Sequence, residues 1–266
     1  MVKPTPNISI PVDLMNPGQF FACCGLLELA DRLWPGAEGW FSEHIFQMQC
    51  DGQLNEIIIA LANVELIPLD SDDATASPIL IAFQHSPLRL DWWRDNRAGG
   101  RQLKVWAGSM ESVGIARSMQ NSMKAEAFHD ANLLDQGTVV WDVDNSANKK
   151  EPFYFDARRA MNAHSRDIGF SPNKLDFTTV AFPAVEILCL IGLQRALPRS
   201  IGLPRIFEYC TWHLPLSSSV IQAAVSGLIP QVRSNTYRFE NGYRTGQRKH
   251  KAFRPAVLVD KGVSHV

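Results

Sequence analysis

Residues 16–34 read NPGQFFACCGLLELADRLW, and this segment determines the centre of the expected fold. Asn16 is a favoured N-cap residue and Pro17 suits the first helical position, so the segment predicts a helix that begins here. Apolar side chains recur at helical spacing, and further apolar residues extend the apolar surface over more than one face of the helix. This pattern indicates a largely buried helix. Pro35 and Gly36 end it.

A second apolar segment, Ala181–Leu197, predicts another buried helix, which Pro198 ends. It carries Glu186 and Arg195, which argues against a membrane span. Around these two helices, apolar residues alternate or recur at helical spacing and predict shorter elements. The expected strands are Ile8–Val12, Trp40–Cys50, Ile79–Phe83, Leu88–Trp92, Thr138–Val143 and Ile206–Leu214. The expected helices are Gly52–Val64, Ser109–Phe128 and Ser217–Leu228. Residues 57–61 fit a buried strand equally well.

Asn241 and Gly242 separate two strand-like runs, Val232–Phe239 and Tyr243–Phe253. An Asn-Gly pair between such runs is a strong signal for a β-hairpin turn. The expected surface loops are Leu66–Ser77, Arg94–Lys104 and Asn145–Pro152. Together these elements predict an α+β fold of mixed helices and mostly antiparallel sheet, with a C-terminal β-hairpin on one compact body. We expect a single domain over residues 1–266, and residues 145–151 are the best place to divide it.

The composition predicts a chain that can fold around a substantial core and has little overall charge. Hydrophobic residues make up 45% and charged residues 20% of the 266 residues, so the chain can bury a substantial core. The formal net charge is −1, so any binding to DNA or RNA must come from local clusters of Lys and Arg.

The five cysteines lack CxxC spacing, which argues against a disulfide framework or a zinc site. The first residues lack the pattern of a signal peptide, so the expected location is cytoplasmic.

The C-terminal hairpin is the first candidate nucleic-acid site, because cations and aromatic residues are interleaved in it. Cations can follow a phosphate backbone, and exposed aromatic rings can stack on unpaired bases. The expected phosphate contacts are Arg238, Arg244, Arg248, Lys249 and Lys251, and the expected stacking residue is Tyr243. Strand alternation leaves an alternative open, in which the aromatic residues face the core and the cations are simply solvated.

Two other segments are secondary candidates. The loop Arg94–Lys104 has two glycines at its tip, which would let backbone amides approach a phosphate, and its expected contacts are Arg97 and Arg101. It matches neither GxxxxGK[ST] nor GxGxxG, and a solvated loop is the alternative. Residues 153–159 place aromatic residues beside Arg158 and Arg159, which suits either stacking on nucleic acid or a packing corner with exposed arginines.

Signals for a self-contained enzyme are weak. The motifs GxSxG and HExxH are absent. His129 and Asp130 form an HD dipeptide of the kind that metal-dependent phosphohydrolases use. His164 and Asp167 are available as further ligands, but no second spaced motif accompanies them. We therefore expect no catalytic residues, no metal and no cofactor, with an HD-type phosphohydrolase or nuclease as the alternative.

The segment Asn16–Trp34 resembles the N-terminal segment of a CRISPR-associated family, the large-subunit-like protein of type I-U (also called I-G) Cascade complexes. The stretch FDARRAMNAHSRDIGFSP, residues 155–172, is similar to a later block of the same family. The resemblance implies a non-catalytic subunit of an RNA-guided surveillance complex in antiviral defence. Its implied partners are CRISPR RNA, target DNA and other Cascade subunits, with no membrane. A purely structural adaptor is a further alternative.

Overall fold

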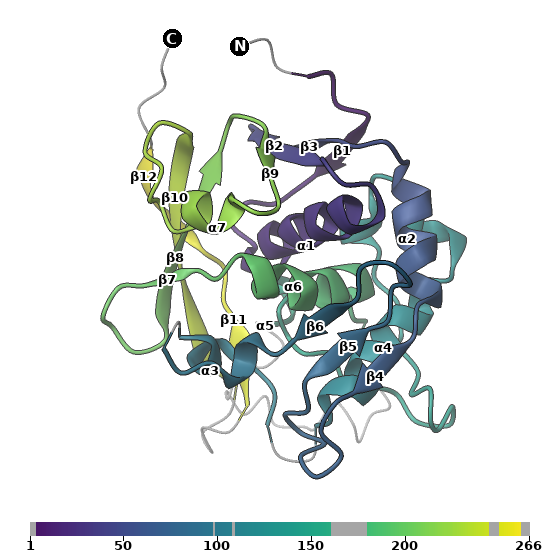
Figure 1. Ribbon diagram of the computed structural model, residues 1–266. Coiled ribbons are helices and arrows are strands. Elements are labelled where there is room, and N and C mark those ends of the chain that lie inside the picture. The colour runs from purple at the N-terminus through teal and green to yellow at the C-terminus, as the bar shows by residue number, and fades with distance from the viewer. Residues whose placement is uncertain (1–3, 98, 108–109, 161–179, 245–249, 262–266) are drawn as a thin grey trace.

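Two buried helices, α1 (Pro17–Leu33) and α6 (Pro183–Arg195), lie side by side at the centre of the molecule (Figure 1). The computed structural model describes residues 4–97, 99–107, 110–160, 180–244 and 250–261. Every residue from Pro17 to Ala30 in α1 and from Pro183 to Leu193 in α6 is buried. The two long apolar segments of the sequence therefore form the core helices, as predicted.

The α1–α6 crossing brings the two backbones into contact at a pair of glycines. A Cβ atom at Gly25 would lie 2.0 Å from the carbonyl oxygen of Leu188, and one at Gly192 would lie 1.9 Å from that of Phe21. Real Cβ atoms do not approach backbone oxygens so closely, so only glycine fits at either position. Close approach lets the side chains around the crossing pack at the density of a protein interior.

Polar contacts fix both ends of α1. The Asn16 side chain caps the helix by accepting a hydrogen bond of 3.1 Å from the Gly18 amide, as the sequence predicts. Near the other end, the buried Glu28 carboxylate accepts hydrogen bonds of 2.7 Å from both Arg32 and Arg195. A buried carboxylate needs such partners, and Arg195 belongs to α6, so this pair also joins the two helices.

The two segments that carry the CRISPR resemblance meet at the start of α1. The Asn16 side-chain amide donates to Asp156 at 3.0 Å, and its oxygen accepts from the Ala157 amide at 3.0 Å. Glu186 of α6 is also buried here and accepts from the amides of Phe155 and Asp156 at 3.2 and 3.1 Å. The described part of the second segment, residues 155–160, therefore packs directly against the first.

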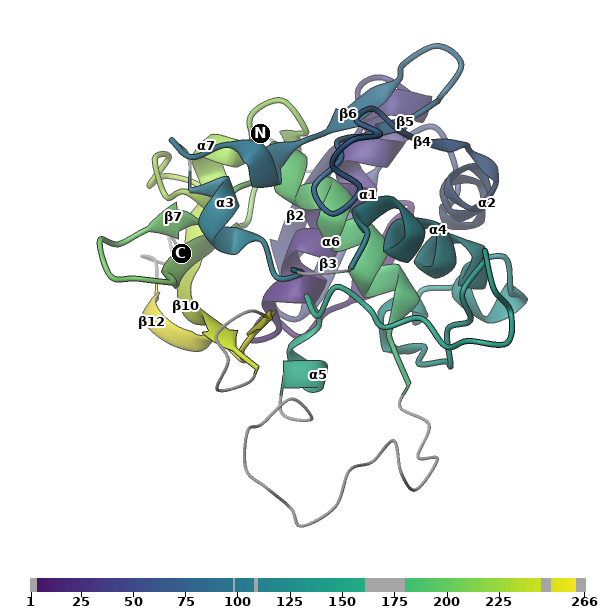
Figure 2. The same ribbon diagram turned by 90° about the horizontal axis from the view of Figure 1, so that it is seen from below.

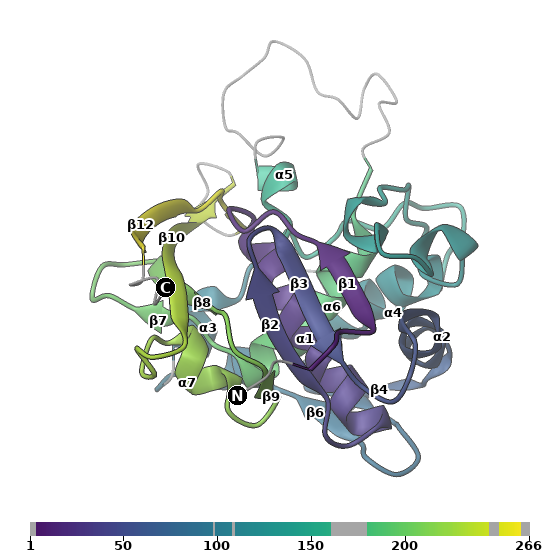
Figure 3. The same cartoon turned by 90° about the horizontal axis from the view of Figure 1, so that it is seen from above.

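A small antiparallel sheet of order β1-β3-β2-β9 covers α1, as Figure 3 shows from above. Its strands are β1 (Ile8–Pro11), β2 (Glu38–Ser42), β3 (Ile45–Gln49) and β9 (Leu216–Ser217). The prediction of one strand over Trp40–Cys50 is wrong, because Glu43 turns the chain with a φ of 52° and residues 38–49 form a hairpin. Apolar residues on both arms of a short hairpin resemble one longer strand in sequence.

A second antiparallel sheet, of order β4-β5-β6, lies on the side of α6 away from the first. Its strands are β4 (Leu66–Pro68), β5 (Ile79–Ile81) and β6 (Leu88–Leu90), so the expected loop Leu66–Ser77 begins with a strand. Residues 57–61 are helical, in α2 (Leu54–Asn63), and the expected long helix Ser109–Phe128 is described as α4 (Ser112–Ser122). The predicted strand Thr138–Val143 forms only two isolated bridges.

The third sheet, of order β11-β10-β8-β7 with β12 also on β10, carries the C-terminal hairpin. Its strands are β7 (Arg199–Ser200), β8 (Ile206–Trp212), β10 (Arg233–Tyr243), β11 (Lys251–Phe253) and β12 (Val257–Lys261). Figure 2 shows this sheet with α3 (Gly100–Leu103) on one side of the central helices and α4 on the other. The remaining helices are η1 (Trp92–Arg94), η2 (Glu126–Phe128), η3 (Leu133–Asp135), α5 (Ala157–Ala160) and α7 (Ile221–Val225).

The predicted turn at Asn241 and Gly242 is wrong, because both residues lie inside β10. They pair with Phe253 and Ala252 of β11, so the hairpin connection falls after Tyr243. The Asn241 side chain donates to the carbonyls of residues 102 and 103 at 2.8 and 3.0 Å. A Cβ at Gly242 would lie 2.1 Å from Nε of Arg254. Asn and Gly therefore serve tertiary contacts here, not a turn.

One cluster of buried hydrophobic residues extends from Ile8 to Ala256 through all three sheets. Trp92, Trp93 and Trp106 pack edge to face inside it and are 2–3% exposed, so they form core rather than a partner surface. The mixed helices and mostly antiparallel sheets on one body confirm the predicted α+β class. Among the described residues, no helix has both the length and the apolar character to cross a bilayer.

Candidate nucleic-acid interface

Strand β11 is where the three predicted basic segments meet. The Lys251 amide donates to the carbonyl of Val105 at 3.0 Å, which joins the hairpin to the end of the segment Arg94–Lys104. The Phe253 amide donates to the carbonyl of Tyr154 at 3.1 Å, which joins it to residues 153–159. These segments are far apart in the sequence, and only the strand pairing shows that they are neighbours.

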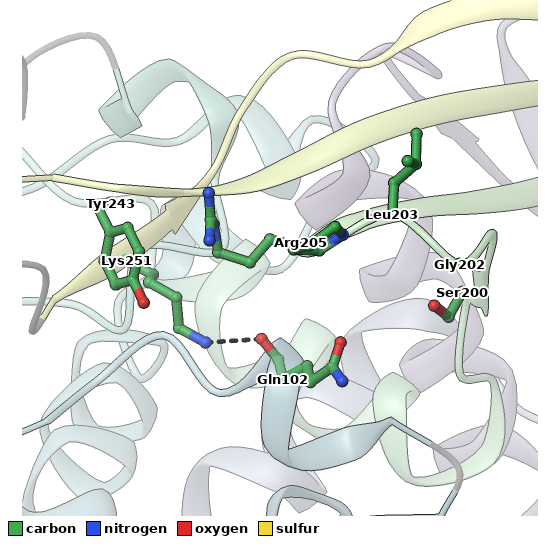
Figure 4. A pocket seen from close by; sticks show the side chains of 8 residues that line it. Gln102, Ser200, Gly202, Leu203, Arg205, Tyr243 and Lys251 are labelled. Carbon is green, nitrogen blue, oxygen red and sulfur yellow. Dashed lines mark hydrogen bonds between the residues drawn. The ribbon is translucent and has the colours of Figure 1, made fainter.

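A pocket of about 400 Å³ opens between the hairpin, α3 and the loop that follows β7 (Figure 4). The lining residues belong to α3, β7, the loop after β7, β10 and β11, and Arg205 and Lys251 are the cations among them (Figure 4). The lining residues are Gln102, Ser200, Gly202, Leu203, Pro204, Arg205, Tyr243 and Lys251. Of the residues predicted from sequence to contact nucleic acid, Tyr243 and Lys251 line this pocket.

Lys251 is a desolvated cation at one wall of the pocket. Its ammonium group donates to the carbonyl oxygen of Gln102 at 2.6 Å, the dashed line in Figure 4. Burial, with the positive charges of Arg205 and Lys104 adding to it, lowers the pKa of Lys251 to about 8. The group is therefore still mostly protonated at neutral pH, although its surroundings disfavour its charge.

Arg205 is the second cation, and the sequence did not single it out. Its guanidinium carbon lies 4.7 Å from the centre of the Tyr243 ring, a cation–π contact. Glu240 lies 3.9 Å away and is also 3.5 Å from Arg254, so one carboxylate faces two arginines. The Nε atom of Arg205 is buried without a hydrogen-bond partner among the described residues.

The backbone of Arg205 is unusual as well, with a φ of 62° in the left-handed region. Such a conformation costs a non-glycine residue about 1 kcal/mol or more, and it persists where the surroundings enforce it. The carbonyl of Arg205 accepts a hydrogen bond of 2.9 Å from the Asn241 amide, which holds the loop against β10. The fold therefore fixes this arginine at the pocket at some cost in backbone strain.

A second pocket, of about 330 Å³, also lies beside α3, and cations line it too. Its lining residues are Asp73, Thr75, Ala76, Trp93, Arg94, Arg101 and Lys104. Burial lowers the pKa of Lys104, and Arg101 lowers it further against the opposing effect of Asp73. Arg97 and Arg101 are exposed, as expected for solvated or ligand-binding cations.

The two glycines of this segment have a structural use, and their approach to a phosphate stays a prediction. Gly99 has a φ of 82° and precedes α3. Gly100 is buried, and a Cβ there would lie 1.8 Å from the carbonyl oxygen of Trp92. Both positions therefore require glycine for the fold itself.

The arginines of residues 153–159 are engaged in packing. Arg158 binds Asp156 and Asp135, each at 2.7 Å, and its guanidinium lies 3.4 Å from the centre of the Phe182 ring. Arg159 is only 4% exposed and lies 5.4 Å from the Tyr154 ring. These contacts fit a packing corner better than free phosphate contacts, but Arg159 is buried, whereas that alternative expected exposed arginines.

Two predicted arginines of the hairpin also have partners. Arg238 binds the Glu208 carboxylate at 2.6 Å, and Arg199 binds the same group at 2.5 Å. The Arg244 guanidinium lies 3.2 Å from the centre of the Tyr154 ring. Arg248 and Lys249 lie outside the described residues. Tyr237 and Phe239 face the core, which is the alternative that strand alternation left open.

The HD dipeptide has ordinary structural contacts. The Asp130 carboxylate accepts from the Asn132 amide at 2.8 Å, and His129 Nε2 lies 3.3 Å from the carbonyl oxygen of Met123. Over the described ranges, no three His, Cys, Asp or Glu side chains are grouped so that they could hold a metal ion. His164 and Asp167 lie outside those ranges.

Comparisons with known proteins add no relative to these observations. No protein-family model, curated protein or solved structure matches this chain significantly. The CRISPR resemblance therefore rests on residues 16–34 and 155–172 of the sequence alone.

Proposed function

We propose that this chain is a non-catalytic subunit of a type I CRISPR surveillance complex that binds the sugar-phosphate backbone of guide RNA or target DNA. The observation that carries the nucleic-acid part is the pocket at β10 and β11. Arg205 and Lys251 line it, none of its described lining residues is acidic, and Glu240 lies 3.9 Å from Arg205. The anionic group of nucleic acid that could bind in a pocket lined by cations is its phosphate.

The charge of the whole chain is consistent with a local contact of this kind. A formal net charge of −1 gives no long-range attraction for nucleic acid. The cations that line the two pockets are instead gathered near α3, and they are Arg94, Arg101, Lys104, Arg205 and Lys251. A subunit that shares a nucleic-acid channel with basic neighbours needs no more than such a patch.

The two segments that resemble the CRISPR-associated family support membership in a surveillance complex, but they do not identify the nucleic-acid contact. Residues 17–30 are buried in α1, and the described part of the second segment is held to α1 by the Asn16–Asp156 hydrogen bond. Side chains buried in this way specify a fold. The phosphate contacts are therefore assigned from the pocket, and membership in the complex from the resemblance.

The first test is purification of the tagged protein from cells that carry its native gene neighbourhood. We expect short, uniform, repeat-derived RNA and several partner proteins to copurify. Recovery of the protein alone, free of nucleic acid, would contradict the surveillance-complex proposal. Metal-dependent cleavage of nucleic acid that is lost in His129→Ala would instead favour the phosphohydrolase alternative.

The second test measures the affinity of the purified complex for target DNA at several salt concentrations. In the double variant Arg205→Gly, Lys251→Met, we expect weaker binding and a salt slope that is smaller by about 1 for each phosphate that the variant no longer neutralises. Glycine suits the positive φ of residue 205, and methionine keeps the length of the lysine side chain, so the fold should survive. Lys124→Met, at an exposed lysine outside both pockets, is the matched control.

A further inference from the structure

We propose that the pocket formed by Arg205, Tyr243 and Lys251 binds a phosphomonoester dianion, such as the terminal phosphate of a nucleic-acid strand or of a free mononucleotide. This inference rests on the proposed function where it takes a strand end as the ligand. It goes further because it names the ionic form of the ligand and gives Tyr243 a role different from base stacking.

The balance of charge at the pocket favours a dianion. Arg205 and Lys251 line it, and Lys104 is close enough to affect the charge state of Lys251. Against these three cations stand Glu240, which Arg254 already approaches at 3.5 Å, and Asp73, which faces Lys104 from the second pocket. An internal phosphodiester carries one negative charge, whereas a terminal phosphomonoester carries up to two at neutral pH. The monoester therefore compensates more of the excess positive charge.

The donors at the pocket are already fixed in place. Lys251 is held by its hydrogen bond of 2.6 Å to the Gln102 carbonyl, and an ammonium group has two further N–H donors. Arg205 is held by its backbone contact with Asn241 and by the ring of Tyr243. Donors that are ordered before binding lose less conformational entropy when a ligand arrives, which raises its affinity.

Tyr243 is better placed to orient Arg205 than to stack on a base. The guanidinium lies 4.7 Å from the ring centre, so one face of the ring is already covered by a cation. Tyr243 also belongs to β10 and pairs with Lys251 across the hairpin, so the residue that contacts Arg205 is anchored beside the strand that carries the second cation. We therefore assign Tyr243 as a positioning residue of the phosphate site.

The pH dependence of binding follows from the groups around the pocket. A phosphomonoester loses its second proton near pH 6, so affinity for the dianion rises through that region. Lys251 loses its charge as the pH passes about 8. The other charged groups nearby are Arg205, Lys104, Arg254 and Glu240, with Asp73 and Arg101 acting on Lys104. Binding should therefore be tightest between about pH 6 and 8.

The experiment measures binding of short single-stranded oligonucleotides to the full-length chain, with a terminal phosphate or a terminal hydroxyl, at pH 5–9.5. Unlabelled AMP and inorganic phosphate are the competitors. We expect the phosphorylated strand to bind at least about tenfold more tightly, the difference that one charge-assisted hydrogen bond supports. Lys251→Met and Arg205→Gly should each remove this preference, and Lys124→Met should keep it.

Variants of Tyr243 separate positioning from overall folding. Tyr243→Phe keeps the ring and should keep the preference for a terminal phosphate. Tyr243→Leu should reduce that preference at an unchanged melting temperature. A loss of preference in Tyr243→Phe as large as that in Tyr243→Leu would show that the hydroxyl group is required, which would overturn the positioning role.

The possible results distinguish this inference from the proposed function. Equal binding of both strands, weakened together in the pocket variants, would overturn the phosphomonoester site and leave backbone binding intact. Direct binding of AMP, measured by calorimetry, without any binding of oligonucleotides would support the site and identify a free nucleotide as its source, against the proposed function. Tighter binding of the phosphorylated strand than of AMP would identify a strand end. Binding of neither class would overturn both proposals.

Discussion

Lys251 lines the pocket, and burial and neighbouring cations make its protonated form less favourable than in water. Its pKa of about 8 in the folded chain lies below the ordinary lysine value of 10.5, so the unfolded chain binds more protons between these two pH values. The stability of the wild type should therefore rise as the pH increases from about 8 to 10.5. Lys251→Met removes the charge and should be more stable than the wild type at pH 7, by up to about 3 kcal/mol. Urea unfolding of both proteins at pH 7 and pH 10 measures this difference in unfolding free energy, which should be smaller at pH 10. A constant difference would contradict this account of Lys251.

Glu186 is the opposite case, an acid whose burial and the neighbouring Asp156 charge raise its pKa to about 7. The folded chain holds a proton there between about pH 4.5 and 7 that the unfolded chain has lost, so this group's contribution to stability falls as the pH rises through that range. In Glu186→Gln the pH dependence should be flatter. The variant should also be destabilised by about 1–3 kcal/mol, because one of two acceptors for the amides of Phe155 and Asp156 becomes a donor. Unfolding measured from pH 5 to 7.5, with the exposed Glu65→Gln as control, tests both effects.

Residue types in the sequence predicted part of the candidate site and missed its geometry. Lys251 and Tyr243 were identified because cations and aromatics alternate in the hairpin. Arg205 was missed, since only the pairing of β8 with β10 brings its loop to the hairpin. Arg238 and Arg158 were predicted from composition, which cannot show that Glu208 and Asp156 already bind them.

At the scale of elements, the contact between α1 and α6 depends on two glycines. Gly25→Ala or Gly192→Ala would place a methyl group against the backbone of the other helix and force the pair apart. We expect each change to destabilise the fold by about 3 kcal/mol or more, at the upper end of overpacking effects. Gly114→Ala in α4 is the matched control, because its nearest neighbour is the flexible end of Lys150 at 3.1 Å. Thermal and urea unfolding should place Gly114→Ala within about 1 kcal/mol of the wild type. Similar losses in all three variants would mean that the close approach is not the cause.

Elements with local signals were predicted, and elements that depend on distant contacts were not. The start of α1 follows from Asn16 and Pro17, which act within one turn of helix. The Asn241–Gly242 turn was wrong because α3 and Arg254, both remote in sequence, determine what those two residues do. Residues 40–50 were assigned to one strand because nothing in their composition marks Glu43 as a turn with positive φ.

The whole molecule separates its core from its charged surface. The sheets and helices that surround α1 and α6 contribute to one buried cluster, and the cations gather around α3 and β11 at its edge. The sequence predicted the α+β class, which follows from the periodicity of apolar residues. From the low net charge it also predicted that any nucleic-acid binding would use a local patch of Lys and Arg. It did not predict that three separate basic segments meet at β11, since that arrangement depends on the topology of the third sheet.

The burial of α1 on all sides has a consequence for how the chain is made. The helix ends at Leu33, but α6, which covers it, ends at Arg195. At typical translation rates the ribosome needs on the order of 10 s to make the residues between them. During that interval a strongly apolar helix has emerged without its partner, and its uncovered surface is open to self-association. We therefore expect nascent chains shorter than about 195 residues to depend on chaperones for solubility, because the centre of this fold closes late in synthesis.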